Sequence, residues 1–335
     1  MEDNKIKRKG LITAAGLAAV LAVSVYAEGG QDSTANTGVS QTRGIRKGQD
    51  SGIILPPPSS GLVTRPEDQA NFDRFVWQAD KLKANYGKVV IIDARVKGDY
   101  NTEHLPGSVQ LHWKDLIADK YNAVPSDSKI ATEFARRGID VSKTIVVYNE
   151  PLAGVAEEAR ILWLLRYLGI TDSYILNGGL SYWKAHGGEV TKEKTVVPAL
   201  NPVSSFKRNE RLIISTEELA SRLGTVNVLD SRSDEEYAKS RIPGVKFIWF
   251  KDFYHADGTC FTPAETRARC ASLGFAEDSE VIVHCLGGIR SSLPFVLLQT
   301  AGYKDVRNYS ASFAGWTGTK QRLDEQVYSN IPAYH

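Results

Sequence analysis

The sequence predicts an α/β fold in two similar domains, each a mainly parallel sheet flanked by helices. Three observations support this prediction. The 335 residues suffice for two domains of roughly 100–150 residues each. One block of sequence occurs twice in the body of the chain. Within each copy, short β-branched runs alternate with helical stretches, an order that is typical of parallel strands joined by helices.

The composition excludes several classes of protein. With 42% apolar and 24% charged residues, the chain can fill its cores, which excludes a fibrous or wholly disordered protein. A net charge of +2 gives no electrostatic basis for binding nucleic acid, and we expect no such partner. Three cysteines are too few for a disulfide-rich scaffold or a cysteine-rich zinc site. We expect no metal and no cofactor.

The first 27 residues (1–27) predict a signal peptide. Basic residues from Lys5 to Lys9 precede an unbroken apolar run over 11–25, and Ala27 ends a small-residue cleavage site. We therefore expect export, to a bacterial periplasm. The alternative is an uncleaved membrane anchor, because the run is close to the shortest span of a bilayer.

Residues 28–68 predict a disordered linker. They are rich in Gly, Ser, Thr, Gln and Pro and carry few large apolar groups, so they cannot bury enough surface to offset the entropy of ordering. The two repeated domains are then expected over 69–200 and 201–335.

Two blocks define the repeat, and their spacing locates one deletion. The first block aligns at an offset of 137 residues, whereas the second begins at an offset of 136 and ends at 133. Copy two is therefore three residues shorter just after an apolar strand, at Cys285. The pairs that fix this alignment are Asp93 and Asp230, Arg95 and Arg232, Gly138 and Gly274, Gly169 and Gly302, and Trp183 and Trp316.

In the first copy we expect strands near 89–93, 145–148 and 173–176, and helices near 128–137 and 155–168, with equivalents in the second copy. The functional edge of such a sheet is the carboxyl end of its strands, where strand passes into helix.

Cys285 lies at such an edge. It ends the buried-strand run 281–284, and a glycine-rich loop leads from it into an apolar helix. Loop amides and the positive end of a helix favour an anion, so a thiolate there would have a lowered pKa and be nucleophilic. The alternative is a cysteine buried as a small apolar residue. The loop consists of Leu286, Gly287, Gly288, Ile289, Arg290 and Ser291.

These motifs together resemble a tandem-domain rhodanese, of the thiosulfate sulfurtransferase family. Asp230-Ser-Arg, with the Glu-Tyr and Ile-Pro-Gly that follow, is similar to the first signature of that family. The run Cys285-Leu-Gly-Gly-Ile-Arg-Ser is similar to its active-site loop, and the segment ending Gly315-Trp316 to its closing motif. The resemblance covers residues 62–325.

The resemblance implies an enzyme of the EC 2.8.1 class that works through a Cys285 persulfide. A sulfane sulfur would pass from thiosulfate or a similar small donor to Cys285, and then to cyanide, a small thiol or a protein acceptor. Copy one has Asn149 in place of the cysteine, so it should be catalytically silent. As in similar tandem proteins, copy one is expected to pack on copy two.

Two departures leave the donor open. This family often carries basic residues before the Tyr of the first signature and within the loop, where this chain has Glu236, Leu286 and Gly287. One alternative is therefore an exported carrier that holds persulfide sulfur without appreciable turnover on thiosulfate. Another is a cysteine phosphatase or oxyanion reductase, but only four residues separate Cys285 from Arg290, and the phosphatase loop has five.

Arg290 has two alternative roles. It could orient the sulfonate oxygens of a donor, or pair with a nearby carboxylate at the helix start.

The other notable residues have structural interpretations. Asp230 and Arg232 recur in the silent copy, which favours a role in bracing the fold. His284 should point away from Cys285 by strand alternation, which favours a structural role, and the alternative is a thiol-activating base. We expect Trp183, Trp316 and Cys270 in the core and Cys260 at the surface, with a Cys260–Cys270 disulfide left open. The recurrent pair in copy one is Asp93 and Arg95.

Overall fold

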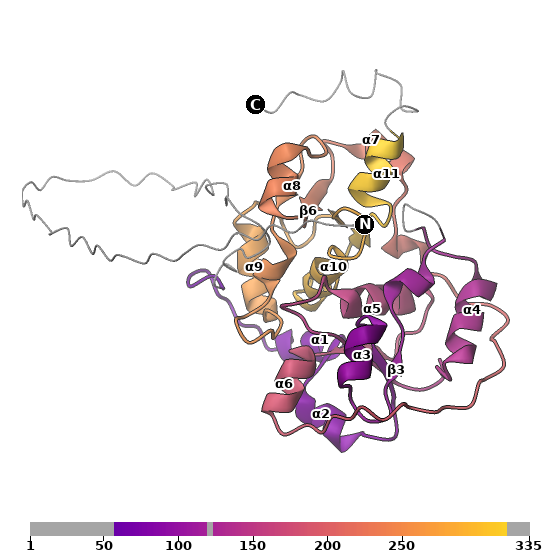
Figure 1. Cartoon of the computed structure of the whole chain (residues 1–335). Helices are drawn as coiled ribbons and strands as arrows, with labels where there is room; N and C mark the ends of the chain where they lie inside the picture. The colour runs from indigo at the N-terminus through magenta and orange to yellow at the C-terminus, as the bar shows by residue number, and fades with distance from the viewer. Residues whose placement is uncertain (1–56, 119–122, 320–335) are drawn as a thin grey trace, which may run out of the picture. The chain divides into compact units, whose positions relative to one another are not determined.

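The computed structural model describes residues 57–118 and 123–319 (Figure 1). The predicted signal peptide and most of the predicted linker lie outside the described residues. Among the helices of the described ranges, none is long and apolar enough to cross a bilayer.

Each copy forms a parallel sheet, as predicted. In the described residues the first sheet has five strands in the order β1-β5-β4-β2-β3, and the second has four in the order β7-β6-β8-β9. The two sheets share a register, because Asp93 lies opposite Tyr148 in one and Asp230 opposite His284 in the other. The strands are β1 (Val76–Trp77), β2 (Val90–Asp93), β3 (Val109–Gln110), β4 (Ile145–Tyr148), β5 (Ser173–Leu176), β6 (Asn227–Asp230), β7 (Lys246–Phe247), β8 (Val281–His284) and β9 (Val306–Asn308).

Helices flank both sheets, and polar caps start several of them. Ser126, Ser215, Ser233 and Thr262 each accept a hydrogen bond from a backbone N–H of the first turn. The α-helices are α1 (Asp68–Asp73), α2 (Ala79–Ala84), α3 (Lys97–Thr102), α4 (Asp127–Arg136), α5 (Glu157–Tyr167), α6 (Gly179–Ala185), α7 (Thr216–Arg222), α8 (Asp234–Lys239), α9 (Pro263–Ala271), α10 (Ser292–Thr300) and α11 (Ser312–Thr319). Short 3₁₀ turns are η1 (Trp113–Leu116), η2 (Glu210–Leu212) and η3 (Phe250–Phe253).

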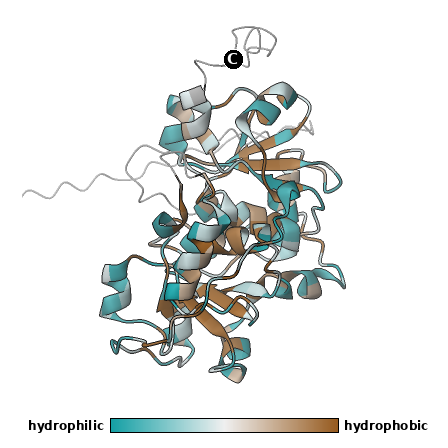
Figure 2. Ribbon diagram, turned by 90° about the vertical axis from the view of Figure 1, so that its right-hand side faces the viewer, coloured by the Kyte–Doolittle hydropathy of each residue, from teal (hydrophilic) through white to brown (hydrophobic). Residues whose placement is uncertain are grey.

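The expected elements of copy one match β2, β4, β5, α4 and α5 closely. The two-residue strands β1, β3 and β7 were not predicted, because a strand of that length has no readable alternation. Trp183, Trp316 and Cys270 are buried as expected. Figure 2 shows the hydrophobic strands inside and the more hydrophilic helices outside.

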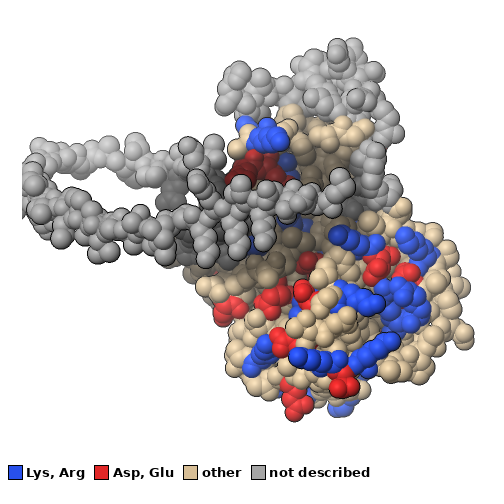
Figure 3. Space-filling model, viewed as in Figure 1, with Lys and Arg blue, Asp and Glu red and all other residues tan. Residues whose placement is uncertain are grey.

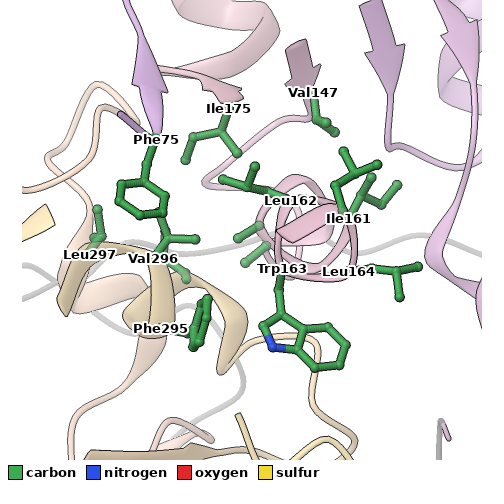
Figure 4. Close-up of a cluster of buried hydrophobic side chains, with 14 of the residues drawn as sticks. Phe75, Val147, Ile161, Leu162, Trp163, Leu164, Ile175, Phe295, Val296 and Leu297 are labelled. Carbon is green, nitrogen blue, oxygen red and sulfur yellow. The ribbon is translucent and has the colours of Figure 1, made fainter. Parts of the chain in front are cut away.

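Helix α5 joins the cores of the two copies. Its run from Ile161 to Leu165 is apolar on every side, which is the pattern of a helix buried all round. Figure 4 shows Leu162 near Ile175 of the first sheet, while Phe295 of α10 lies close to the other side of the helix. One continuous cluster of buried side chains contains residues of both copies.

Polar contacts also connect the copies, and they correct two expectations. Cys260 was expected at the surface, but it is only 4% exposed, because it packs in the buried cluster that contains residues of both copies. Its N–H also donates to Asn177 Oδ1 of copy one at 2.8 Å. The end of the predicted linker belongs to the folded part, since Arg65 and Asp68 form ion pairs with Glu277 and Arg267 of copy two.

Candidate active site

Cys285 directly follows β8 and is held by the first residues of α11. The Cys285 N–H donates to Ser312 Oγ at 3.1 Å, and the Phe313 N–H donates to the Cys285 carbonyl at 3.0 Å. The residue is only 1% exposed. The backbone of Cys285 is thus held at the carboxyl edge of the sheet, where the sequence places it.

The loop turns backbone N–H groups toward the sulfur. The Gly288 N–H donates to Cys285 Sγ at 3.1 Å. Gly288 has φ +79°, and a Cβ there would lie 2.5 Å from the Ser310 carbonyl oxygen. Only glycine satisfies both the left-handed backbone and this close approach. Leu286, in contrast, is 48% exposed and leaves an apolar side chain at the surface of the loop.

The environment favours the thiolate of Cys285. Burial by itself would raise the pKa of Cys285, but the positive charge of Arg290 and backbone hydrogen bonds from Ser291 and Gly287 outweigh it, so the pKa lies below its usual value. By contrast, burial raises the pKa of Cys270 to about 12 and that of Cys260 well above its usual range. All three cysteines are free, with no Cys260–Cys270 disulfide.

Arg290 serves two neighbours. Its guanidinium donates to both carboxylate oxygens of Glu236, with Nη1 2.5 Å from Oε2 and Nη2 2.9 Å from Oε1. Burial would raise the pKa of Glu236, but Arg290 holds it down to about 2. The carboxylate pairing that was one alternative for Arg290 is therefore present, and it compensates part of the charge that faces Cys285.

Asp230 and Arg232 form an internal brace. Arg232 Nε and Nη2 donate to the Asp230 carboxylate, and Nη2 also donates to the Ser240 carbonyl at 2.7 Å. The guanidinium lies over the ring of Phe313 at 4.0 Å. Arg95 and Asp93 repeat this pair in copy one. A geometry that also occurs in the copy without a cysteine is consistent with the expected structural role.

His284 lies beside this brace. Its Nδ1 is 3.2 Å from the Cys285 carbonyl oxygen, and its Nε2 is 3.7 Å from Asp230 Oδ2. Burial lowers the pKa of His284, so the neutral imidazole is favoured. These contacts are to a carbonyl and a carboxylate.

Copy one holds an anion of its own at the equivalent place. The Val155 N–H and the Asn149 side-chain amide donate to Glu157 Oε2 at 2.7 and 2.8 Å. The offset of 133 residues that relates Gly169 to Gly302 also relates Glu157 to Arg290. A carboxylate in copy one therefore replaces both the thiolate and its cation, which gives a physical reason for the silence expected of this copy.

Sequence reasoning missed three residues around the loop. Asn308 Nδ2 donates to the Gly288 carbonyl at 3.2 Å, and Ser312 holds the Cys285 N–H. Arg160 of α5 in copy one reaches the same loop, where its Nη1 donates to the Gly288 carbonyl at 3.2 Å. The available signal was the position of Arg160, a cation directly before the apolar run 161–165 in a copy that lacks the cysteine.

Metal ligands do not gather in the part of the chain that the structure describes. There, no three His, Cys, Asp or Glu side chains lie close enough together to hold a metal ion.

Comparisons with known proteins agree with the repeat. The model of the rhodanese-like domain matches residues 78–186 and 215–319. The "Sulfur carrier protein TtuD" of Thermus thermophilus is 29% identical over 245 residues, which span 65% of this chain and 83% of that protein. The "Thiosulfate sulfurtransferase" of Azotobacter vinelandii is 26% identical over 265 residues, which span 75% and 96%.

A solved structure has the same fold. The crystal structure of the 3-mercaptopyruvate sulfotransferase SseA from Escherichia coli superimposes with a TM-score of 0.64 at 23% sequence identity, covering 71% of this chain and 98% of SseA. Both copies of the α/β unit thus have counterparts among known proteins.

Proposed function

The chain belongs to the rhodanese-like family, and from that premise we propose that it is a sulfurtransferase whose Cys285 carries the transferred sulfur. The observation that supports this most directly is the Gly288 N–H on Cys285 Sγ, within a buried loop whose charges and dipoles favour an anion. Relatives named as thiosulfate sulfurtransferases support the reaction class.

The proposed transfer has two displacements. The Cys285 thiolate attacks the outer sulfur of a donor such as thiosulfate, the S–S bond of the donor breaks, and sulfite leaves with the electron pair. The enzyme then holds a Cys285–S–S⁻ persulfide. An acceptor such as cyanide or a thiolate attacks the outer sulfur, and the Cys285 thiolate leaves with the electron pair of the enzyme's S–S bond.

The chain's own groups have separate roles in this scheme. The N–H of Gly288, with those of Gly287 and Ser291, stabilises the negative charge on sulfur in the thiolate and the persulfide. Arg290 adds a positive charge beside the same atom. Because Glu236 binds both Nη atoms of Arg290, the attraction for a doubly charged donor is reduced.

That pairing favours a second candidate function, a sulfur carrier. A carrier would accept sulfur on Cys285 and hand it to a protein partner, with little turnover on thiosulfate. The relative named as a sulfur carrier protein supports this candidate.

Export to a bacterial periplasm belongs to the proposal as well, and N-terminal sequencing of the protein from cells tests cleavage after Ala27.

Mass spectrometry after exposure to thiosulfate tests the chemistry. We expect a gain of one sulfur atom on the peptide that contains Cys285, and none on the peptides of Cys260 and Cys270. Cys285→Ser is the control and should take up no sulfur. Steady thiocyanate production with cyanide would identify the enzyme, whereas stoichiometric loading without turnover would identify the carrier. Loading that persists in Cys285→Ser would contradict both.

A further inference from the structure

Arg160 is a buried cation that copy one places against the loop of copy two. It belongs to α5 and is 3% exposed. Many Lys and Arg side chains lie at the surface among Asp and Glu, as Figure 3 shows for one face, and the buried Arg232 and Arg267 form ion pairs with Asp. Arg160 instead stacks over the ring of Trp163, 4.4 Å from its centroid. A buried charge is costly unless polar groups receive it, so the identity of its partners bears on function.

Arg160 donates hydrogen bonds to two segments of the proposed active site. Its Nη1 donates to the Gly288 carbonyl at 3.2 Å and to Ser310 Oγ at 3.0 Å. The backbones of these two residues approach each other closely, since a Cβ on Gly288 would lie 2.5 Å from the Ser310 carbonyl oxygen. Arg160 therefore bridges the loop that follows β8 and the segment that precedes α11.

The contact with the Gly288 carbonyl fixes the orientation of the loop. In a trans peptide the carbonyl and the next N–H point in opposite directions, so holding the Gly288 carbonyl toward Arg160 also orients the Ile289 N–H. Asn308 Nδ2 and Ser292 Oγ donate to the same carbonyl at 3.2 and 2.9 Å. The residue so held is the one whose own N–H donates to Cys285 Sγ.

The charge of Arg160 is also coupled to the reactive sulfur. Burial lowers the pKa of Arg160 to about 10, and the negative charge of Cys285 acts in the opposite direction. Other titratable groups around Cys285 include Arg290 with Glu236, and His284 with Asp230 and Arg232. Arg160 differs from these because it comes from copy one.

We propose that Arg160 is a positioning residue through which the silent copy shapes the sulfur-binding loop of copy two. By holding Gly288 and Ser310 together, it keeps the loop amides on the Cys285 sulfur. The proposal rests on the proposed function for its catalytic meaning. The effect on the Cys285 thiol can be measured without any turnover.

The test compares Arg160→Gln and Arg160→Lys with Arg166→Gln. Arg166 is a matched control, because it lies on the same helix and burial lowers its pKa to about 10, but its Nη2 donates to the Arg74 and Ser173 carbonyls of copy one. The first readout is the pH dependence of iodoacetamide alkylation at Cys285, followed by peptide mass spectrometry. The second is the rate of sulfur loading from thiosulfate, and thermal unfolding checks the fold.

For Arg160→Gln we expect the alkylation midpoint to move to higher pH and sulfur loading to slow by about tenfold or more, because the loop amides lose their alignment. Arg160→Lys keeps the charge and one donor, so it should lie between this variant and the wild type. Arg166→Gln should resemble the wild type in both readouts.

Two results would overturn the inference. One is an Arg160→Gln protein that folds and has the alkylation profile of wild type, and the other is an equal shift in Arg166→Gln. If Arg160→Gln does not fold, Arg160→Lys decides by the same comparison. A wild-type protein that never loads sulfur would contradict the proposed function alone, since the alkylation profiles would still test Arg160.

Discussion

Gly288 combines a left-handed backbone conformation with a direct hydrogen bond to the Cys285 sulfur. Its N–H donates to Cys285 Sγ, its carbonyl accepts from three side chains, and its φ of +79° excludes most other residues. Gly244 has a similar φ of +74°, but a Cβ there would meet nothing within 4 Å. The two glycines therefore separate the cost of a left-handed backbone from the cost of the close approach.

Gly288→Ala should destabilise the protein by about 2–4 kcal/mol, because strain and a clash with the Ser310 carbonyl add together. Gly244→Ala should cost only about 1 kcal/mol, from backbone strain. Urea unfolding measures both. Sulfur loading should be lost in Gly288→Ala and kept in Gly244→Ala. Equal stabilities for the two variants would show that the Ser310 contact has no energetic weight.

The three cysteines should react at very different rates. The pKa of Cys285 is lowered by Arg290 and the loop amides against the effect of burial, whereas burial raises the pKa of Cys270 to about 12. A lowered pKa means more thiolate at neutral pH, and the thiolate is the reactive form. Iodoacetamide at pH 7 should therefore label Cys285 first in the folded protein. Labelling of Cys260 or Cys270 at the same rate would contradict this order.

At the scale of elements, the same strand, loop and helix give opposite sites in the two copies. After β8, the Cys285 sulfur faces the loop amides, and the cation Arg290 lies just before α10. After β4, Glu157 occupies the place of Arg290, and its carboxylate receives the Val155 N–H and the Asn149 amide. The anion site of copy one is thus filled from within the chain.

Asn149→Cys should therefore not create a second sulfur site. In a Cys285→Ser background, the introduced thiol would lie beside Glu157, whose negative charge raises a thiol pKa. We expect no sulfur loading from thiosulfate. Adding Glu157→Gln should increase alkylation of the introduced thiol by about tenfold at pH 7, by removing that charge. Rapid sulfur loading of Asn149→Cys without the Glu157 change would show that the Glu157 carboxylate does not block this site.

The sequence predicts the longer elements and the position of Cys285, because apolar strand runs and the repeat are local signals. Arg290 and Glu236 are 54 positions apart in the sequence. From the sequence alone, a carboxylate partner was therefore only one of two possible roles for Arg290. Arg160 and the burial of Cys260 depend on how the copies contact each other, through Gly288 and Asn177. No local pattern encodes such contacts, so these parts required the structure.

At the scale of the whole molecule, the segment before the first sheet is tied to copy two. Asp68, at the start of α1, accepts from Arg267 of α9 in a bidentate pair, and the side chains are only 7% and 8% exposed. The nearby pair of Arg65 with Glu277 is more than one third exposed on both sides. Buried and exposed ion pairs respond differently to loss of one partner, because a charge left in the interior cannot be solvated.

Asp68→Asn should lower the free energy of unfolding at pH 7 by about 3–5 kcal/mol, because it leaves Arg267 buried without its counter-charge. Glu277→Gln, the exposed counterpart, should cost at most about 1 kcal/mol. The hydrogen bond from Arg267 lowers the pKa of Asp68, so the ionised carboxylate stabilises the fold above its unfolded pKa of about 4 and the effect is lost as the pH falls further. Urea unfolding from pH 7 to pH 3 should therefore show the wild type and Asp68→Asn converging at low pH, and a difference that does not change with pH would contradict the role of this ion pair.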